Sequence, residues 1–362
     1  MTHKLLKRAL VVLLSVVSIS IDAQEKPVLW YDKPAQYWEE ALPLGNGRLG
    51  AMVYGNPAAE EIQLNEETVS AGSPYKNYNP EAKGALATIR QLIFAGRYPE
   101  AQELAGEKIL SKNGFGMPYQ TVGSLRLDFP GHENYINFRR ELDLEKAVAT
   151  TAYTVNGVDY KREVFTSFVD QLVIVRLTAS QPGKLTFSAS LTCPQKVDVT
   201  VSGKNALILE GTTKGDDFTK GAIRFRADLK LDLQGGKSVA GDTLLSVTNA
   251  NSATIYIAMA TNFVNYKDIS GNPSERNKIS MKNAGKNYAR ALQAHINVYQ
   301  KYYNRVSLNL GRTSQADKPT DVRVKEFATS NDPHLVALYF QFGRYLLCLL
   351  YTSPSPRDMR RS

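Results

Sequence analysis

The chain has 362 residues, a formal net charge of +9 and two cysteines. Residues 1–23 and 348–362 each carry a net +2, so +5 is spread over the long segment between them, too sparse for a nucleic-acid-binding protein. Cys193 is the only cysteine of that segment, which excludes an internal disulfide within it. The four histidines form no His/Cys cluster at metal-ligand spacing, so we expect neither a metal nor another cofactor.

The N-terminus has the pattern of a signal peptide. Lys4, Lys7 and Arg8 precede an apolar run from Ala9 to Val17, and Ala23 offers a small residue for cleavage. The run is too short to span a membrane, and no later stretch is long and apolar enough to do so. We therefore expect residues 1–23 to be removed on export, leaving a periplasmic or secreted protein with no membrane partner.

Residues 28–72 are strand-like and rich in turns. Leu49–Gly55 predicts a buried strand bounded by glycines, and Glu61–Asn65 alternates like a half-buried strand. Residues 80–112 predict a helical insertion of two helices, because Pro80 and Pro99 stand at helix starts and Gly96 stands at a helix end.

From Gly123 to Ala260 the period-two pattern returns and repeats many times, with turn residues between the segments. Asn156-Gly157 between two such segments predicts a two-residue hairpin. This many strands without intervening helices predicts a mainly β fold, a large antiparallel sandwich that we assign to residues 24–275.

Residues 276–331 predict a helical linker, with a helix over Tyr288–Val306 and a short strand over Val306–Gly311. Residues 332–347 predict an apolar helix that begins at Asp332 as N-cap and Pro333 as first helical residue. We expect its apolar positions to need further helices to cover them: Leu335, Leu338, Phe342 and Leu346. The segment Cys348–Ser362 begins CLLYTSPSPRD, which resembles a translated sequencing adapter, so we expect it to be an artefact.

Several motifs together resemble one family. Glu40 to Gly55 reads EALPLGNGRLGAMVYG, and the resemblance continues through Gln63 to Thr68, Arg139 to Leu144 and Asp332 to Leu347. These segments are similar to the family-95 glycoside hydrolases, which are α-L-fucosidases with some α-L-galactosidases. The chain departs from the family at Val69–Gly72, where a Trp is more common.

The resemblance implies a β-supersandwich, a helical linker, an (α/α)6 barrel and a C-terminal β domain. It also implies inverting hydrolysis of a terminal α-L-fucosyl linkage, in which an acidic carboxyl protonates the leaving oxygen and a second carboxylate activates water. In the family these carboxylates lie deeper in the barrel, so no catalytic residue can be assigned here. The implied partner is a fucosylated glycan that binds through the missing barrel.

Three residues are candidates for contacting substrate or the barrel: Arg48, Asn65 and Glu66. Asn65 and Glu66 are chosen because they stand at a strand end that is followed by a loop. Arg48 could pair with a carboxylate of the barrel or lie on the surface. The adjacent pairs Glu60-Glu61 and Glu66-Glu67 should point to opposite faces of a strand, so we expect solvated edges and turns and no catalytic pair.

The aromatic residues near the start allow two interpretations. Trp30, Tyr31, Tyr37 and Trp38 could form a sugar-binding surface or fill the core and domain interfaces, and we favour packing. A stand-alone carbohydrate-binding β module is the alternative to a fucosidase fragment. Such a module should end near Gly311, whereas this chain begins a new apolar helix at Pro333, which favours the fragment.

Overall fold

The computed structural model describes residues 26–76, 78–111, 118–215, 219–285 and 287–349. The predicted signal peptide and residues 350–362 of the predicted adapter segment lie outside the described residues. Helix α7 (Pro333–Leu349) continues through Cys348 and Leu349, the first two residues of that segment, and both pack against the core.

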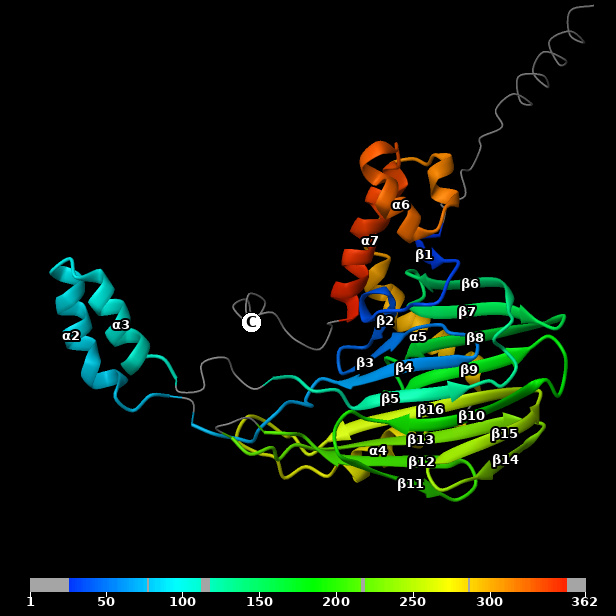
Figure 1. Ribbon diagram of the computed structural model, residues 1–362, viewed down its shortest axis with the longest axis horizontal. Coiled ribbons are helices and arrows are strands. Elements are labelled where there is room, and N and C mark those ends of the chain that lie inside the picture. Colours follow the sequence, from blue (N-terminus) through cyan, green and yellow to red (C-terminus); the bar gives the residue numbers. More distant parts are fainter. Residues whose placement is uncertain (1–25, 77, 112–117, 216–218, 286, 350–362) are drawn as a thin grey trace, which may run out of the picture.

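The described residues form two antiparallel sheets of nine and seven strands that stack face to face (Figure 1). The nine-stranded sheet has the order β1 (Val28–Tyr31), β6 (Ile136–Asp143), β7 (Val148–Val155), β8 (Val158–Thr166), β9 (Val173–Ala179), β16 (Ser252–Thr261), β13 (Arg224–Gln234), β12 (Ala206–Thr212) and β11 (Val197–Ser202). The seven-stranded sheet has the order β14 (Lys237–Ala240), β15 (Leu244–Ala250), β10 (Leu185–Thr192), β5 (Gly123–Asp128), β4 (Ala59–Glu66), β3 (Leu49–Val53) and β2 (Leu42–Gly45). The predicted mainly β, antiparallel sandwich is confirmed.

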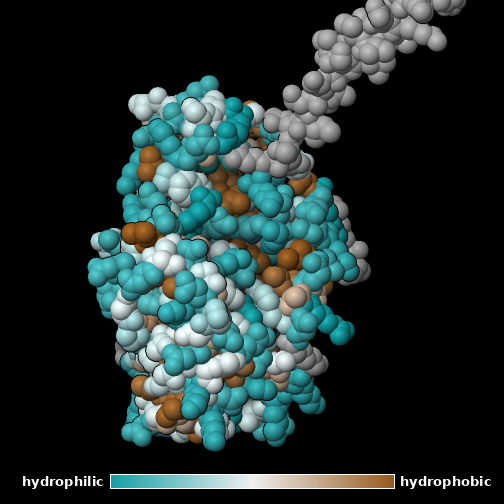
Figure 2. Space-filling model, turned by 90° about the vertical axis from the view of Figure 1, so that its right-hand side faces the viewer, coloured by the Kyte–Doolittle hydropathy of each residue, from teal (hydrophilic) through white to brown (hydrophobic). Residues whose placement is uncertain are grey.

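The period-two pattern places one side of each strand in the core between the sheets. On β4, Ile62 and Leu64 are buried in that core, while Glu61, Gln63 and Asn65 point outward. Such outward-facing polar positions explain why the surface in Figure 2 is largely hydrophilic, with hydrophobic residues in small groups. The polar outer face of the seven-stranded sheet follows directly from this alternation.

Strand β16 is the exception, because all ten of its residues are buried. Its inner side faces the other sheet, and its outer side is covered by α4 (Pro273–Met281) and a small apolar cluster that includes Tyr288 and Leu292 of α5 (Tyr288–Tyr303). Burial on both faces accounts for the unbroken run of small and apolar residues in this strand.

Turns and helix ends follow the sequence closely. Asn156 and Gly157 join β7 to β8 with φ of 49° and 74°, the left-handed pair that a two-residue hairpin requires, so the predicted hairpin is confirmed. Asp332 caps α7 as predicted, because its Oδ1 accepts a hydrogen bond from Leu335 N at 3.0 Å. Two helices, α2 (Ala82–Phe94) and α3 (Tyr98–Lys108), occupy the predicted insertion and stand apart from the sheets (Figure 1).

Two local predictions for the segment after α5 are wrong. Residues 306–311 form no strand, and the carbonyl of Val306 accepts a hydrogen bond from Arg344 of α7 at 2.6 Å. Leu335 and Leu338 of α7 need no further helices to cover them, since they are only 8% and 1% exposed against the main core. Between α5 and α7 lie η2 (Ser314–Asp317), α6 (Thr320–Glu326) and η3 (Phe327–Thr329).

The described residues lack two further features. They contain no helix long and apolar enough to cross a membrane. They also contain no group of three or more His, Cys, Asp or Glu side chains that could hold a metal ion.

Candidate functional site

Arg48 is presented by the tight turn between β2 and β3. Asn46 organises this turn: its Oδ1 accepts hydrogen bonds from Arg48 N at 3.2 Å and Leu49 N at 2.8 Å, and its Nδ2 donates to Ser167 O at 2.8 Å. Gly47 has a φ of 89°, which is accessible to glycine at little cost. The turn therefore holds Arg48 in a fixed position between the two sheets.

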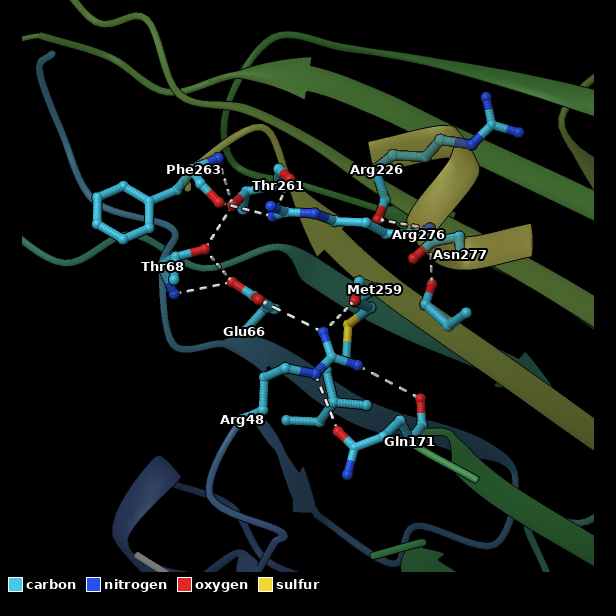
Figure 3. A network of polar contacts seen from close by, with 12 residues as sticks. Arg48, Glu66, Thr68, Gln171, Arg226, Met259, Thr261, Phe263, Arg276 and Asn277 are labelled. Atoms are coloured by element: carbon cyan, nitrogen blue, oxygen red, sulfur yellow. Dashed lines mark hydrogen bonds and ion pairs between the residues drawn. The ribbon is translucent and has the colours of Figure 1, made fainter. Parts of the chain in front are cut away.

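The Arg48 guanidinium joins elements of both sheets (Figure 3). Its Nη1 donates to Met259 O at 2.7 Å and contacts Glu66 Oε1 at 3.4 Å, and its Nε donates to Gln171 Oε1 at 2.9 Å. Burial lowers the pKa of Arg48, and the neighbouring Glu66 carboxylate opposes that effect. Among the described residues, the carboxylate that pairs with Arg48 is Glu66, at the end of the adjacent strand β4.

Glu66 closes β4 and is 4% exposed. Its second oxygen, Oε2, accepts hydrogen bonds from Thr68 N at 2.8 Å and from Thr68 Oγ1 at 2.6 Å. The Thr68 hydroxyl in turn contacts the hydroxyl of Thr261, at the end of β16 (Figure 3). Both carboxylate oxygens are therefore engaged, and the network ties the end of β4 to the end of β16.

A depression of about 270 Å³ opens beside this network. Its described lining consists of Arg48, Glu66, Gln171, Met259, Ala260, Arg276, Asn277, Ile279 and Ser280. Glu66 is the single carboxylate in that lining, whereas inverting glycoside hydrolysis needs two, about 6.5–9.5 Å apart. The arrangement can fix the two sheets relative to one another but lacks an acid–base pair.

Asn65 lies on the opposite side of β4 from Glu66, as expected for neighbouring residues of a strand. It lines a cleft of about 580 Å³ on the outer face of the seven-stranded sheet, together with Trp38 and Tyr119. The structure thus brings two of the three predicted residues, Arg48 and Glu66, into one site and places the third in another. Contact of any of them with substrate or a barrel stays a prediction.

The sequence-based interpretation of the paired glutamates is wrong for one member of each of two pairs. Glu60 and Glu66 are 1% and 4% exposed, and each is bonded to an arginine. Glu60 Oε2 contacts Arg162 Nη1 at 3.0 Å, so this pair is a buried ion pair and no solvated edge. A signal was present in the sequence, because Glu60 and Glu66 share the strand phase of the buried Ile62 and Leu64.

The four aromatic residues near the start divide into two groups. Trp30 and Tyr31 pack under the guanidiniums of Arg139 and Arg140, which lie 4.3 Å and 4.2 Å from the ring centres, as the packing interpretation predicted. Tyr37 and Trp38 do not fill the core, since they are 66% and 54% exposed, and packing at a domain interface stays a prediction for them. Trp38 belongs to the rim of the cleft that contains Asn65.

Two segments of the chain, the β-sandwich and the helical C-terminal segment, each match a glycoside hydrolase family. Residues 29–266, more than half of the chain, match the model described as glycosyl hydrolase family 65, N-terminal domain. Residues 287–353 match the model described as glycosyl hydrolase family 95 catalytic domain. The antiparallel β-sandwich followed by helices, together with these matches, places the chain among the glycoside hydrolases. The larger part of the chain belongs to the family-65 type of N-terminal domain, and its C-terminal part is similar to the start of a family-95 catalytic domain.

Curated relatives agree with this assignment. The chain is 35% identical over 353 residues to "Alpha-L-fucosidase 2" of Arabidopsis thaliana, covering 88% of this chain and 41% of the relative. It is 27% identical over 346 residues to "Probable alpha-fucosidase A" of Aspergillus niger, covering 88% and 42%. The chain therefore spans less than half the length of these relatives.

Among solved structures, this chain is similar to a bacterial glucoamylase complexed with acarbose. The superposition has a TM-score of 0.36 and 9% sequence identity, and it covers 76% of this chain and 40% of the glucoamylase chain. The family assignment therefore rests on the sequence matches. The family-95 match begins at residue 287, inside the segment predicted to be a linker, so the border between linker and catalytic domain stays a prediction.

Proposed function

We propose that this chain is the N-terminal, non-catalytic part of an exported α-L-fucosidase that removes terminal α-L-fucosyl groups from glycans with inversion. The observation that carries the proposal is the 35% identity to the Arabidopsis protein named an α-L-fucosidase, sustained over 353 residues. An α-L-galactosidase of the same family is the alternative, because L-fucose is 6-deoxy-L-galactose and the two sugars differ only by the hydroxyl group on C6.

The chemistry of the buried acids supports a non-catalytic role for the described residues. Glu60, Glu66 and Asp332 are the acidic residues that are nearly inaccessible to solvent in the described part of the chain, and each contacts an arginine. A general acid must instead keep a proton near neutral pH, and a general base must face an attacking water. Both oxygens of each of these carboxylates are already engaged by guanidiniums and backbone N–H groups inside the fold, so they are not free to act on a substrate.

We expect the purified 362-residue chain to release no product from 4-nitrophenyl α-L-fucoside above the buffer background. The reason is that the catalytic carboxylates of the proposed enzyme lie outside this chain. The matched positive control is a longer protein that carries the same sequence through Leu347 and a complete family-95 catalytic domain. That protein should hydrolyse the fucoside faster than the corresponding α-L-galactoside, and proton NMR should detect the inverted anomer first.

Turnover by the short chain at a rate comparable to the longer protein would refute the non-catalytic assignment. A longer protein that prefers the α-L-galactoside would replace the fucosidase proposal with its alternative. Retention of configuration would remove the proposed direct attack of water and call for a covalent intermediate instead.

Export is the second part of the proposal, supported by the basic flank, apolar run and small residue of residues 1–23. In a bacterial host with a secretion pathway, we expect the chain to reach the periplasm or medium with Gln24 as its first residue. N-terminal sequencing of that fraction measures this directly. Leu13→Arg, which places a charge in the apolar run, should keep the chain in the cytoplasm and uncleaved. Equal export of the unmodified chain and this variant would contradict the signal-peptide assignment.

A further inference from the structure

The outer face of the seven-stranded sheet carries a cleft that the network around Arg48 does not use. Its floor is built from alternate residues of two neighbouring strands, with Glu61, Gln63 and Asn65 from β4 and Ser124 and Arg126 from β5. The remaining described lining residues are Trp38, Tyr119, Thr121, Thr192, Cys193 and Pro194. At about 580 Å³ the cleft has the volume of a small-molecule site, typically about 300–1,000 Å³.

The floor of the cleft is polar but close to electrically neutral. Arg126 Nη1 and Glu61 Oε2 form an ion pair at 2.9 Å, and Ser124 Oγ donates to Glu61 Oε1 at 2.8 Å. No other charged residue is in the described lining, so the cleft offers no free cation for a polyanion and no acidic cluster for a metal. Amides and hydroxyls remain to recognise a ligand, and the Asn65 amide has no hydrogen-bond partner among the described residues.

Two aromatic side chains flank this floor. Trp38 and Tyr119 are 54% and 53% exposed, although large aromatic rings usually find apolar cover. The Tyr119 ring is held by its hydroxyl, which donates to Glu66 O at 3.1 Å. The backbone of Trp38 is held in the short helix η1 (Trp38–Glu40), where Trp38 O accepts a hydrogen bond from Ala41 N at 3.1 Å. The surface thus presents Tyr119 from an anchored side chain and Trp38 from an anchored backbone.

Exposed aromatic rings beside uncharged hydrogen-bonding groups match the two surfaces of a neutral sugar. The C–H faces of a pyranose are apolar and can stack on an aromatic ring, while its hydroxyl groups both donate and accept hydrogen bonds. A nucleic acid would need uncompensated cations, and an apolar peptide would leave the amides of the floor without partners.

We propose that this cleft binds a neutral oligosaccharide, with sugar rings against Trp38 and Tyr119 and sugar hydroxyls bonded to Asn65 and the neighbouring floor residues. This binding is a property of the chain itself and requires no hydrolysis. It therefore goes beyond the proposed function and stands or falls separately from it.

The test is surface plasmon resonance on the 362-residue chain, immobilised at low density so that copies do not meet. The probes are 2′-fucosyllactose, which is neutral, and a heparin hexasaccharide, which is strongly acidic. We expect saturable binding of the neutral probe alone. Trp38→Ala should weaken that binding about tenfold, because it removes one stacking face, and Asn65→Ala should weaken it by several fold.

Tyr37→Ala is the matched control, since Tyr37 is 66% exposed beside Trp38 but does not line the cleft. It should change the affinity by less than about twofold. Thermal unfolding of each variant separates loss of a binding contact from loss of the fold. The proposal is overturned if the neutral probe does not bind, if Trp38→Ala binds as tightly as the unmodified chain, or if Trp38→Ala acts only by lowering the unfolding temperature.

The same data distinguish this proposal from the proposed function. Fucoside hydrolysis by the longer protein, together with no saccharide binding by this chain, would refute the cleft alone. Saccharide binding by this chain that depends on Trp38, together with no fucosidase activity in the longer protein, would refute the proposed enzyme alone.

Discussion

Replacing Arg162 with methionine is expected to lower the free energy of unfolding by about 3–5 kcal/mol, because it leaves a buried carboxylate without its counter-charge. The side chains of Arg162 and Glu60 are 3% and 1% exposed and lie 3.0 Å apart. Arg162 also donates from Nη1 to Asn56 O at 2.5 Å and from Nη2 to the Tyr153 hydroxyl at 2.7 Å. Urea denaturation at neutral pH measures the loss.

The loss should shrink as the pH is lowered from about 7 toward about 5. Burial already raises the pKa of Glu60 even with Arg162 beside it, and removal of Arg162 raises this pKa further. When the pKa of a carboxyl is higher in the folded chain than in the unfolded chain, the folded chain takes up the proton first as the pH falls. Protonation then relieves the cost of the unpaired charge, so stability is regained at lower pH.

A neighbouring ion pair provides the control. Arg126 and Glu61 lie 2.9 Å apart on the outer face of the seven-stranded sheet, which also contains Glu60, and their side chains are 44% and 18% exposed. Arg126→Met should cost less than about 1 kcal/mol, because solvent already screens this pair. Adding Glu60→Gln to Arg162→Met should recover part of the stability. Equal losses in Arg162→Met and Arg126→Met would show that burial of the Glu60 pair is unimportant.

The strands could be predicted because a two-residue period is a direct consequence of strand geometry. The same period also indicated which charged residues are buried, since Arg162 alternates in phase with the buried Val158, Tyr160 and Val164. The expectation that the paired glutamates are solvated followed instead from the general tendency of charged residues to lie on the surface. A charged residue in the apolar phase of a strand is evidence for a buried partner, although the sequence does not say which one.

The partners themselves were beyond prediction from one sequence. Glu60 and Arg162 are 102 positions apart, and the carbonyl of Met259 is 211 positions from Arg48. Contacts of this range depend on how the two sheets are stacked, which no local period encodes. The turn that carries Arg48 was predictable from its glycines. The prediction that Asn65 and Glu66 belong to one site ignored the alternation of a strand, and the structure places them on opposite sides of β4.

Helix α7 begins where the sequence predicts, but Leu335 and Leu338 are covered by the core of the sandwich and not by further helices. Leu335, Leu338 and Tyr345 pack into the main core, while the other side of the helix remains exposed. The exposed apolar residues of α7 are Val336 (43%), Tyr339 (78%), Phe340 (42%), Leu346 (38%) and Leu347 (69%). Their spacing of three, four and seven places them along one side of the helix. A helix that is apolar on both sides is typical of a buried helix, so α7 has an unpaired apolar face.

We expect this face to make the 362-residue chain self-associate, because a contiguous apolar patch on a protein surface favours contact with another copy. Size-exclusion chromatography with light scattering should give a mass above that of the monomer, rising with protein concentration. The double variant Tyr339→Lys and Leu347→Lys should shift the chain toward the monomer, while Tyr266→Lys should not, because this tyrosine is 74% exposed but lies outside α7.

A concentration-independent monomer for the unmodified chain would show that the exposed face of α7 is too small or too divided to drive association. The longer protein gives the complementary expectation. Residues 287–353 match a family-95 catalytic domain, so a chain that contains the rest of that domain should cover α7 with further helices. In that chain Tyr339→Lys should no longer act by shifting the protein toward the monomer. It should lower stability instead, because the same substitution would then place a charge inside a helix–helix contact.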